Sequence, residues 1–80
     1  MASNSPEKTF RIGLVSASIF ANEAEGGKRT ILNVNLQRRY RDGDSWKSST
    51  SFGLADIPVA LRVLQLAQGY VEEREAEVSS

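Results

Sequence analysis

The residues best suited to chemistry are amide and guanidinium side chains at every second position between residues 33 and 41. This row consists of Asn33, Asn35, Gln37, Arg39 and Arg41. The positions before and between them hold Leu32, Val34 and Leu36, so the segment alternates like a strand with one buried face. Amides both donate and accept hydrogen bonds, and guanidinium groups are permanently charged donors. A face with these groups and no carboxylate suits a polyanion.

A second alternating segment follows the turn at Asp42-Gly43, which is a strong hairpin signal. A two-residue loop Asp42-Gly43 would pair Arg39 with Trp46, whereas a three-residue loop keeps even positions opposite even positions. A change of one residue in the loop turns every side chain to the other face. We favour the three-residue loop from Arg41 to Gly43, with Gly43 at positive φ. Lys47 then lies beside Arg39 on the outward face, and Tyr40 and Trp46 share the inward one.

The charges of the chain are separated along the sequence, although Lys and Arg balance Asp and Glu overall. Residues 28 to 52 contain six basic and two acidic residues, and residues 53 to 80 contain two basic and five acidic residues. The predicted sheet is therefore basic and the C-terminal part acidic. This distribution is consistent with nucleic-acid binding, and equally with ordinary solvated surfaces.

Catalysis and metal binding are disfavoured by composition. The chain has neither histidine nor cysteine, so the commonest acid–base catalyst and the thiolate ligands are missing. Its carboxylates lie in predicted loops, such as Asp42 and Asp44, or in the acidic C-terminal segment. The sequence predicts a protein that is not an enzyme, with no catalytic residues, cofactor or metal.

Eighty residues predict one domain, which we place at residues 9–71. Residues 1–8 are polar and without periodicity and predict a disordered leader. Residues 72–80 predict a disordered acidic tail, because negative charge at a helix C-terminus opposes the helix dipole. No signal peptide or membrane span is visible, so we expect a cytoplasmic protein that does not bind membranes.

The first strand segment, Phe10–Phe20, changes parity at Gly13-Leu14, which predicts either one bent strand or two short ones. After this point Phe20 faces outward with the neighbouring serines. An outward Phe could stack on a base, be covered by a second copy, or close the end of the sheet.

One helix is expected from about Leu54 to Val71, with Asp56 capping its start. Its apolar residues form two stripes, which is more than one sheet can cover. Ile57, Leu61, Leu64 and Val71 form the first stripe. The second stripe predicts a homodimer interface formed by Val59, Val63, Leu66 and Tyr70. The alternative is a helix sunk deeply into a curled sheet. The fold class is therefore α+β: an antiparallel, curved sheet of three to four strands followed by one C-terminal helix, dimerising through the helix.

This order of elements resembles the positive-cofactor-four family of transcriptional coactivators, which bind single-stranded DNA and belong to the whirly-like fold group. The resemblance starts at Phe10-Arg11-Ile12-Gly13, continues through the strand from Val34 to Tyr40, and ends at the strand-to-helix junction from Phe52 to Leu61. It covers roughly residues 10–68 and depends on order and spacing rather than on a single motif. Gln37 departs from it, because well-known members have a basic residue there, and so does Leu14, which stands in place of a lysine.

The resemblance implies a dimer joined through the C-terminal helices and a role in transcription regulation or DNA maintenance. It also implies base contact by Tyr40 and backbone contact by Lys28 or Arg29. Together with the residue patterns, it predicts binding of single-stranded nucleic acid, most of all DNA, with low sequence specificity. The predicted binding residues are Lys28, Arg29, Arg39, Arg41, Lys47, Phe20, Tyr40, Trp46, Asn35 and Gln37. Binding of RNA, or of an acidic protein segment, by the same face remains the alternative.

Overall fold

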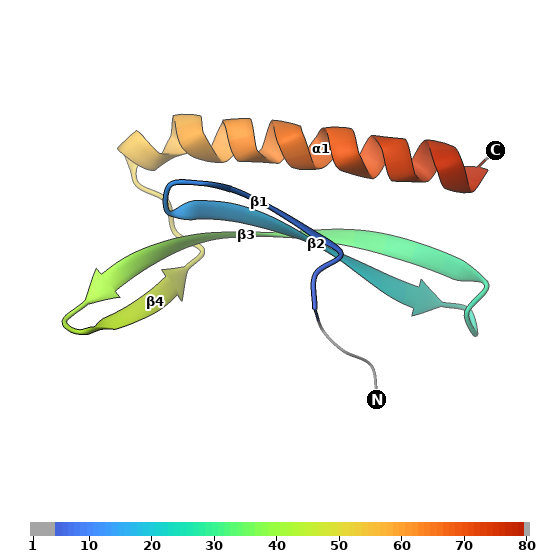
Figure 1. Ribbon diagram of the computed structural model, residues 1–80, viewed down its shortest axis with the longest axis horizontal. Helices are drawn as coiled ribbons and strands as arrows, with labels where there is room; N and C mark the ends of the chain where they lie inside the picture. The colour runs from blue at the N-terminus through green and yellow to red at the C-terminus, as the bar shows by residue number, and fades with distance from the viewer. Residues whose placement is uncertain (1–4, 80) are drawn as a thin grey trace.

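The computed structural model describes residues 5–79 and shows a four-stranded antiparallel sheet with one long helix across it (Figure 1). The strands are β1 (Lys8–Ile12), β2 (Val15–Ala24), β3 (Arg29–Asp42) and β4 (Ser45–Ser49). A 3-10 turn, η1 (Leu54–Asp56), leads into the helix α1 (Ile57–Ser79). The predicted α+β fold, a curved antiparallel sheet followed by one C-terminal helix, is confirmed.

The sheet is a simple meander in the order β1-β2-β3-β4. β1 and β2 are separate strands, of 5 and 10 residues, joined at Gly13-Leu14, where Gly13 has a φ of 60° that favours glycine. Ala17 of β2 lies opposite Phe10 of β1 and Leu36 of β3. One face of these three strands is therefore apolar, as the alternation predicted.

The predicted register of the β3–β4 hairpin is wrong. Asp42 pairs with Ser45, so the loop consists of two residues, Gly43 and Asp44. Gly43 does have positive φ, 65°, and it occupies the first loop position, which is where a two-residue type II′ turn places glycine. The closed loop puts Arg41 opposite Trp46, and Tyr40 opposite Lys47. Every β4 side chain therefore lies on the face opposite to the predicted one.

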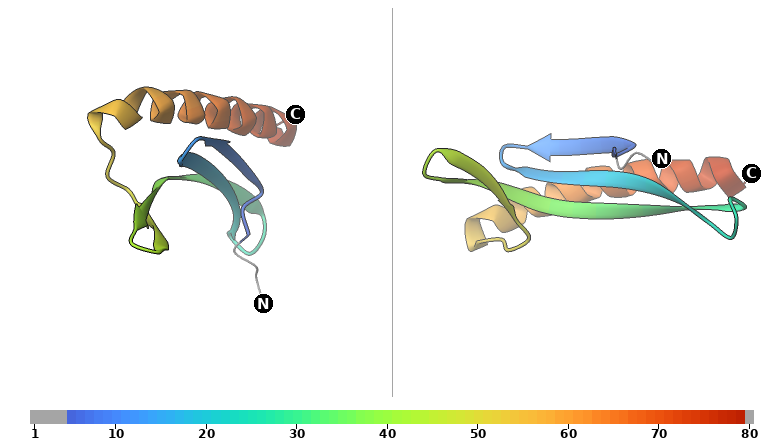
Figure 2. Two further views of the ribbon diagram at one scale, coloured as in Figure 1. Left: turned by 60° about the vertical axis from the view of Figure 1, so that its left-hand side comes forward. Right: turned by 90° about the horizontal axis from the view of Figure 1, so that it is seen from below.

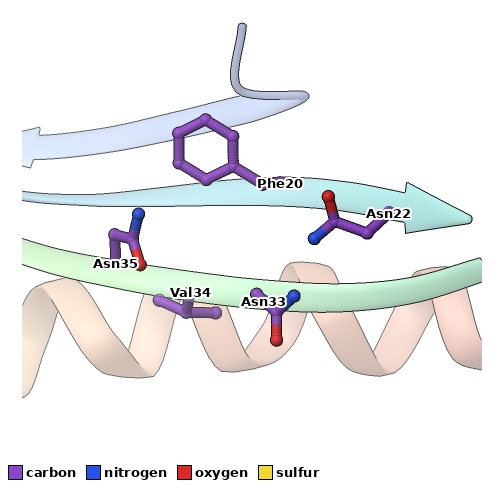
Figure 3. A pocket seen from close by; sticks show the side chains of 5 residues that line it. All are labelled: Phe20, Asn22, Asn33, Val34 and Asn35. Atoms are coloured by element: carbon purple, nitrogen blue, oxygen red, sulfur yellow. The ribbon is translucent and has the colours of Figure 1, made fainter. Parts of the chain in front are cut away.

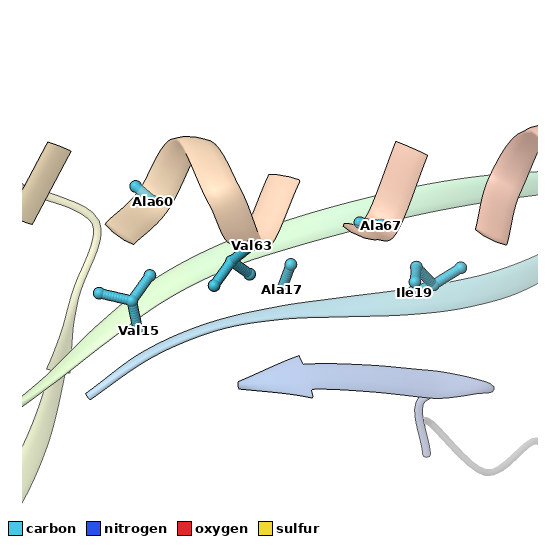
Figure 4. Packing of buried hydrophobic residues seen from close by; sticks show 6 residues of the cluster. All are labelled: Val15, Ala17, Ile19, Ala60, Val63 and Ala67. Atoms are coloured by element: carbon cyan, nitrogen blue, oxygen red, sulfur yellow. The ribbon is translucent and has the colours of Figure 1, made fainter. Parts of the chain in front are cut away.

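The core lies between α1 and the apolar face of the sheet (Figure 4). It consists of Val15, Ala17 and Ile19 from β2 and Ala60, Val63 and Ala67 from α1. The two alanines allow the helix to approach the sheet closely, because they carry the smallest apolar side chains. The sequence reasoning considered only large apolar residues and so missed this line of closest contact.

The burial of the two helix stripes is largely the reverse of the predicted one, although Val71 of the first stripe packs against the core. Val63 of the predicted dimer stripe is 0% exposed, and Val59 and Tyr70 pack around the core. Leu66 is half-buried. The stripe expected to cover the sheet leaves Ile57, Leu61 and Leu64 exposed, with Leu61 57% exposed.

Regular secondary structure begins before residue 9 and continues beyond residue 71, which are the predicted bounds of the domain. Within the predicted leader, Lys8 belongs to β1 and the Glu7 amide donates to the Ile19 carbonyl, whereas residues 1–4 lie outside the described residues. Within the predicted tail, α1 continues to Ser79. A physical reason is an anchor beyond Val71: the Arg74 guanidinium donates to the Glu7 carboxylate (Nη2 to Oε1, 3.1 Å).

In residues 5–79, no helix combines the length and the apolar composition that crossing a membrane requires.

Candidate nucleic-acid interface

The face of the sheet opposite α1 is concave and has no helix over it (Figure 2, left). Strand pairing assigns its residues: Phe20 lies opposite Asn33, and Arg11 and Gln37 both lie opposite Ser16. We call this surface the open face. It consists of Thr9, Arg11, Ser16, Ser18, Phe20, Asn22, Ala24, Arg29, Ile31, Asn33, Asn35, Gln37, Arg39, Arg41, Trp46 and Ser48. Among the paired strand residues, the open face carries four arginines and no carboxylate.

An arginine–tryptophan cluster lies at the β3–β4 end of the open face. The guanidinium carbon of Arg39 is 4.8 Å from the centre of the Trp46 ring, and that of Arg41 is 5.5 Å away. Both distances are within the range of cation–π attraction. Trp46 remains 48% exposed. Neither arginine forms an ion pair within the described part of the chain, although Arg41 Nε donates to the Gly43 carbonyl at 3.1 Å.

The corrected register separates residues that the sequence placed together. Trp46 joins Arg39 and Arg41 on the open face, although the sequence predicted it to face inward. Lys47 lies on the other face, opposite Tyr40, and its ammonium group contacts the Asp42 carboxylate at 2.9 Å. Lys47 and Tyr40 are therefore not part of the open face.

A shallow hollow of about 560 Å³ lies at the middle of the open face (Figure 3). It is lined by Phe20 and Asn22 of β2 and by Asn33, Val34 and Asn35 of β3. The structure describes no hydrogen bond from the three amide side chains to other protein groups. Their donors and acceptors are available for a ligand. Asn35 and Phe20 therefore line the same hollow, whereas the sequence analysis gave no reason to place them together.

The remaining predicted residues lie at other places on the sheet. Lys28 and Arg29 are at the β2–β3 hairpin, at the end of β3 away from Arg39, and the Arg29 guanidinium lies 3.5 Å from the Glu25 carboxylate. Gln37 lies on β3 between the hollow and the cluster. Arg11 was missed by the sequence reasoning, although the alternation of Phe10, Arg11 and Ile12 already indicated an outward cation.

Arg38 lies on the opposite face of the sheet and anchors the β3–β4 hairpin that carries the arginine–tryptophan cluster. Its Nε donates to the Ser51 carbonyl at 3.0 Å and lies 3.4 Å from the Asp56 carboxylate. Asp56, the last residue of η1, also accepts a hydrogen bond from the Gly53 amide, which directly precedes this turn. The strand that carries Arg39 is thereby tied to the start of the helix.

One carboxylate lies at the junction of β1 and α1: Glu7 directly precedes β1 and accepts hydrogen bonds from Tyr70 and Arg74 of α1. Hydrogen bonds from Arg74 and Tyr70 lower the pKa of Glu7 to about 2. The same carboxylate raises the pKa of the Tyr70 hydroxyl. The Tyr70 ring meets the Phe10 ring edge-on at 6.2 Å, so this contact joins β1 to α1.

The described side chains include no group of three or more carboxylates that could hold a metal ion. The groups on the open face that can bind a ligand are its arginines, its amides and its two aromatic rings. Comparison of this chain with protein-family models, with curated proteins and with solved structures finds no match.

Proposed function

We propose that this protein binds single-stranded nucleic acid, above all DNA, on the concave open face. The observation that carries the proposal is the arginine–tryptophan cluster: two guanidinium groups that form no ion pair with any described residue, at 4.8 and 5.5 Å from one half-exposed Trp46 ring. Like charges held on one face repel each other and gain stability when an anion binds between them. The phosphates of a nucleic-acid backbone are such anions.

The aromatic residues favour a single strand over a duplex. Trp46 and Phe20 present rings on the open face, and only unpaired bases can stack on such rings. The hollow beside Phe20 offers three amides that can bond to base edges (Figure 3). Low sequence specificity is expected, since an amide group carries both a donor and an acceptor and every base has a ring face.

The sequence resemblance to the single-stranded-DNA-binding coactivators points in the same direction. It also suggests a role in transcription regulation or DNA maintenance. The four-strand, one-helix order agrees with the order of elements on which that resemblance depends.

The proposal includes a homodimer. Its interface lies on the exposed stripe of α1 instead of on the stripe that contains Val63, which is buried. Leu61, Leu64 and Ile57 form an exposed apolar ridge on α1, next to Val34 of β3. An exposed apolar patch of this kind is typical of an interface. A symmetric pair buries the same ridge on both copies.

The test is a titration of labelled oligonucleotides at two salt concentrations, with single-stranded DNA, duplex DNA and single-stranded RNA in parallel. We expect the single strands to bind more tightly than the duplex, and their affinity to fall steeply with salt. Stronger binding of RNA than of DNA would reassign the ligand. Weak, salt-independent binding of all three would refute the proposal.

A further inference from the structure

One side of β3 is a free strand edge from residue 29 to residue 37. β2 pairs with β3 from Arg29 to Arg38, but on the other side β4 pairs only with the segment from Arg38 to Asp42. Seen from below, β4 flanks only one end of β3 (Figure 2, right). Within the described chain, no strand lies on the remaining edge.

The backbone groups on this edge can be assigned from the hydrogen bonds. The Arg39 amide donates to the Leu14 carbonyl on the β2 side. In a strand, successive residues direct their N–H and C=O groups to opposite sides. The even residues Thr30, Leu32, Val34 and Leu36 therefore direct their backbone groups to the free edge, and the odd residues to β2.

The edge lacks the features that normally prevent pairing. Natural edge strands are kept short or carry lysine, proline or a bulge. From Thr30 to Gln37 this strand has no proline and no charged residue. Its backbone groups and its side chains are therefore well suited to receive another strand.

An apolar groove lies beside the edge on the helix side. It has a volume of about 340 Å³ and is lined by Val34, Leu64, Ala67, Gln68, Val71 and Glu72. Val34 is 38% exposed although it belongs to the apolar row of β3. A strand added to the edge would place every second side chain in this groove.

We propose that the added strand is β3 of a second copy, paired antiparallel about a twofold axis near Asn33. This inference specifies the homodimer of the proposed function and rests on it. The free edge is centred on Asn33, so the whole edge pairs with itself. In this register Leu32 lies opposite Val34 of the second copy, and Arg29 lies opposite Gln37, so no like charges meet between residues 29 and 37.

This arrangement provides partners for both the free edge of β3 and the apolar groove beside it. The even backbone groups gain hydrogen-bond partners, and the apolar side chains of the incoming strand fill the groove. The exposed ridge of Leu61 and Leu64 lies on the same side of α1 as the groove, so the two helices approach across the axis. The open faces of the two copies then join into one concave surface along which a nucleic-acid strand can continue.

Amide hydrogen exchange of the wild-type protein tests the pairing without any substitution. The amides of Leu32, Val34 and Leu36 should exchange slowly, as we also expect of the Asn33 and Asn35 amides, which point towards β2. At a protein concentration about 100 times the dimer Kd, we expect exchange at the three even positions to slow by more than roughly tenfold relative to the monomer. Dilution should restore fast exchange only at the even positions.

Val34→Lys supplies the second arm, because it places a charge in the apolar row at the centre of the new interface. The matched control is Leu14→Lys, at an exposed position in the β1–β2 turn. We expect the Val34 variant to be a folded monomer with fast exchange at Leu32 and Leu36, and the Leu14 variant to remain a dimer.

A dimeric mass with fast exchange at the even amides would overturn edge pairing and leave a dimer through the helices alone. A monomeric wild type would overturn both the pairing and the proposed homodimer. Nucleic-acid binding is judged separately by the salt titration, so its failure cannot be mistaken for failure of the pairing.

Discussion

At the scale of single residues, the open face is defined by which side of the β3–β4 hairpin each cation occupies. Arg39 and Lys47 are both cations on this hairpin, but Arg39 lies beside Trp46 on the open face and Lys47 contacts Asp42 on the other. This pair allows a test in which the charge lost is the same but the face of the sheet differs. Arg39→Gln should weaken binding of single-stranded DNA equally for all sequences, because phosphates carry no sequence information. The plot of log affinity against log salt should become shallower by about 0.7.

Lys47→Gln is the control and should keep the wild-type slope. Equal slopes for the two variants would mean that the cluster does not touch the backbone of the ligand.

Trp46 can be tested separately, because stacking does not involve phosphates. Trp46→Leu should lower the affinity for single strands by roughly 1–3 kcal/mol and leave the salt slope unchanged. Since Trp46 is the only tryptophan, its fluorescence in the wild type should also change on titration with unlabelled oligonucleotide. A constant signal with saturable binding would place the ligand elsewhere.

At the scale of the elements, β1 and the C-terminal half of α1 are held together by Glu7. The carboxylate accepts hydrogen bonds from Arg74 and Tyr70, which lower its pKa to about 2 from an ordinary value of 4.5. A group whose pKa is lower in the folded state stabilises the fold above its unfolded pKa. This stabilisation is complete above about pH 5 and is lost as the pH falls from 4.5 towards about 2.

We expect Glu7→Gln to melt at a lower temperature than the wild type at pH 7 and to approach it near pH 2.5. Thermal melts followed by circular dichroism at both pH values measure this difference. If the melting temperatures of the variant and the wild type differ equally at pH 7 and pH 2.5, the charge of Glu7 does not contribute to the contact.

At the scale of the whole molecule, the small core leaves one flank of α1 uncovered. Leu61 is 57% exposed, and we expect Leu61→Glu to lower the molar mass in solution from that of a dimer to 8.8 kDa. The reason is that a dimer interface would have to bury the new charge without a partner. Light scattering at micromolar concentration measures the mass, and circular dichroism shows whether the variant is folded.

Leu14→Glu is the matched control, since Leu14 is also a half-exposed leucine but lies in the β1–β2 turn. A wild-type mass of 8.8 kDa would contradict the homodimer, and dissociation by both variants would point to a general loss of stability.

Which residues of each strand share a face could be predicted from the alternation of polar and apolar side chains. Strict alternation from Asn33 to Arg41 makes one side polar and basic, because successive side chains point in opposite directions. The same rule placed Phe20 on the polar side and indicated a bend or a break between two strands at Gly13-Leu14. The order of strands and helix was also readable, since Asp-Gly and the helical spacing after Gly53 are local signals.

How those faces combine could not be predicted, because it depends on the packing of segments against one another. The hairpin loop is closed by Asp42 and Ser45, and this difference of one residue in loop length placed Trp46, rather than Lys47, beside Arg39. Likewise, Ala60 and Ala67 bring the helix close to β2, so the stripe with Val63 is buried and the stripe with Leu61 is exposed. Both outcomes depend on contacts between segments distant in sequence. Local periodicity shows that a residue has an apolar or polar neighbour, but not which element that neighbour belongs to.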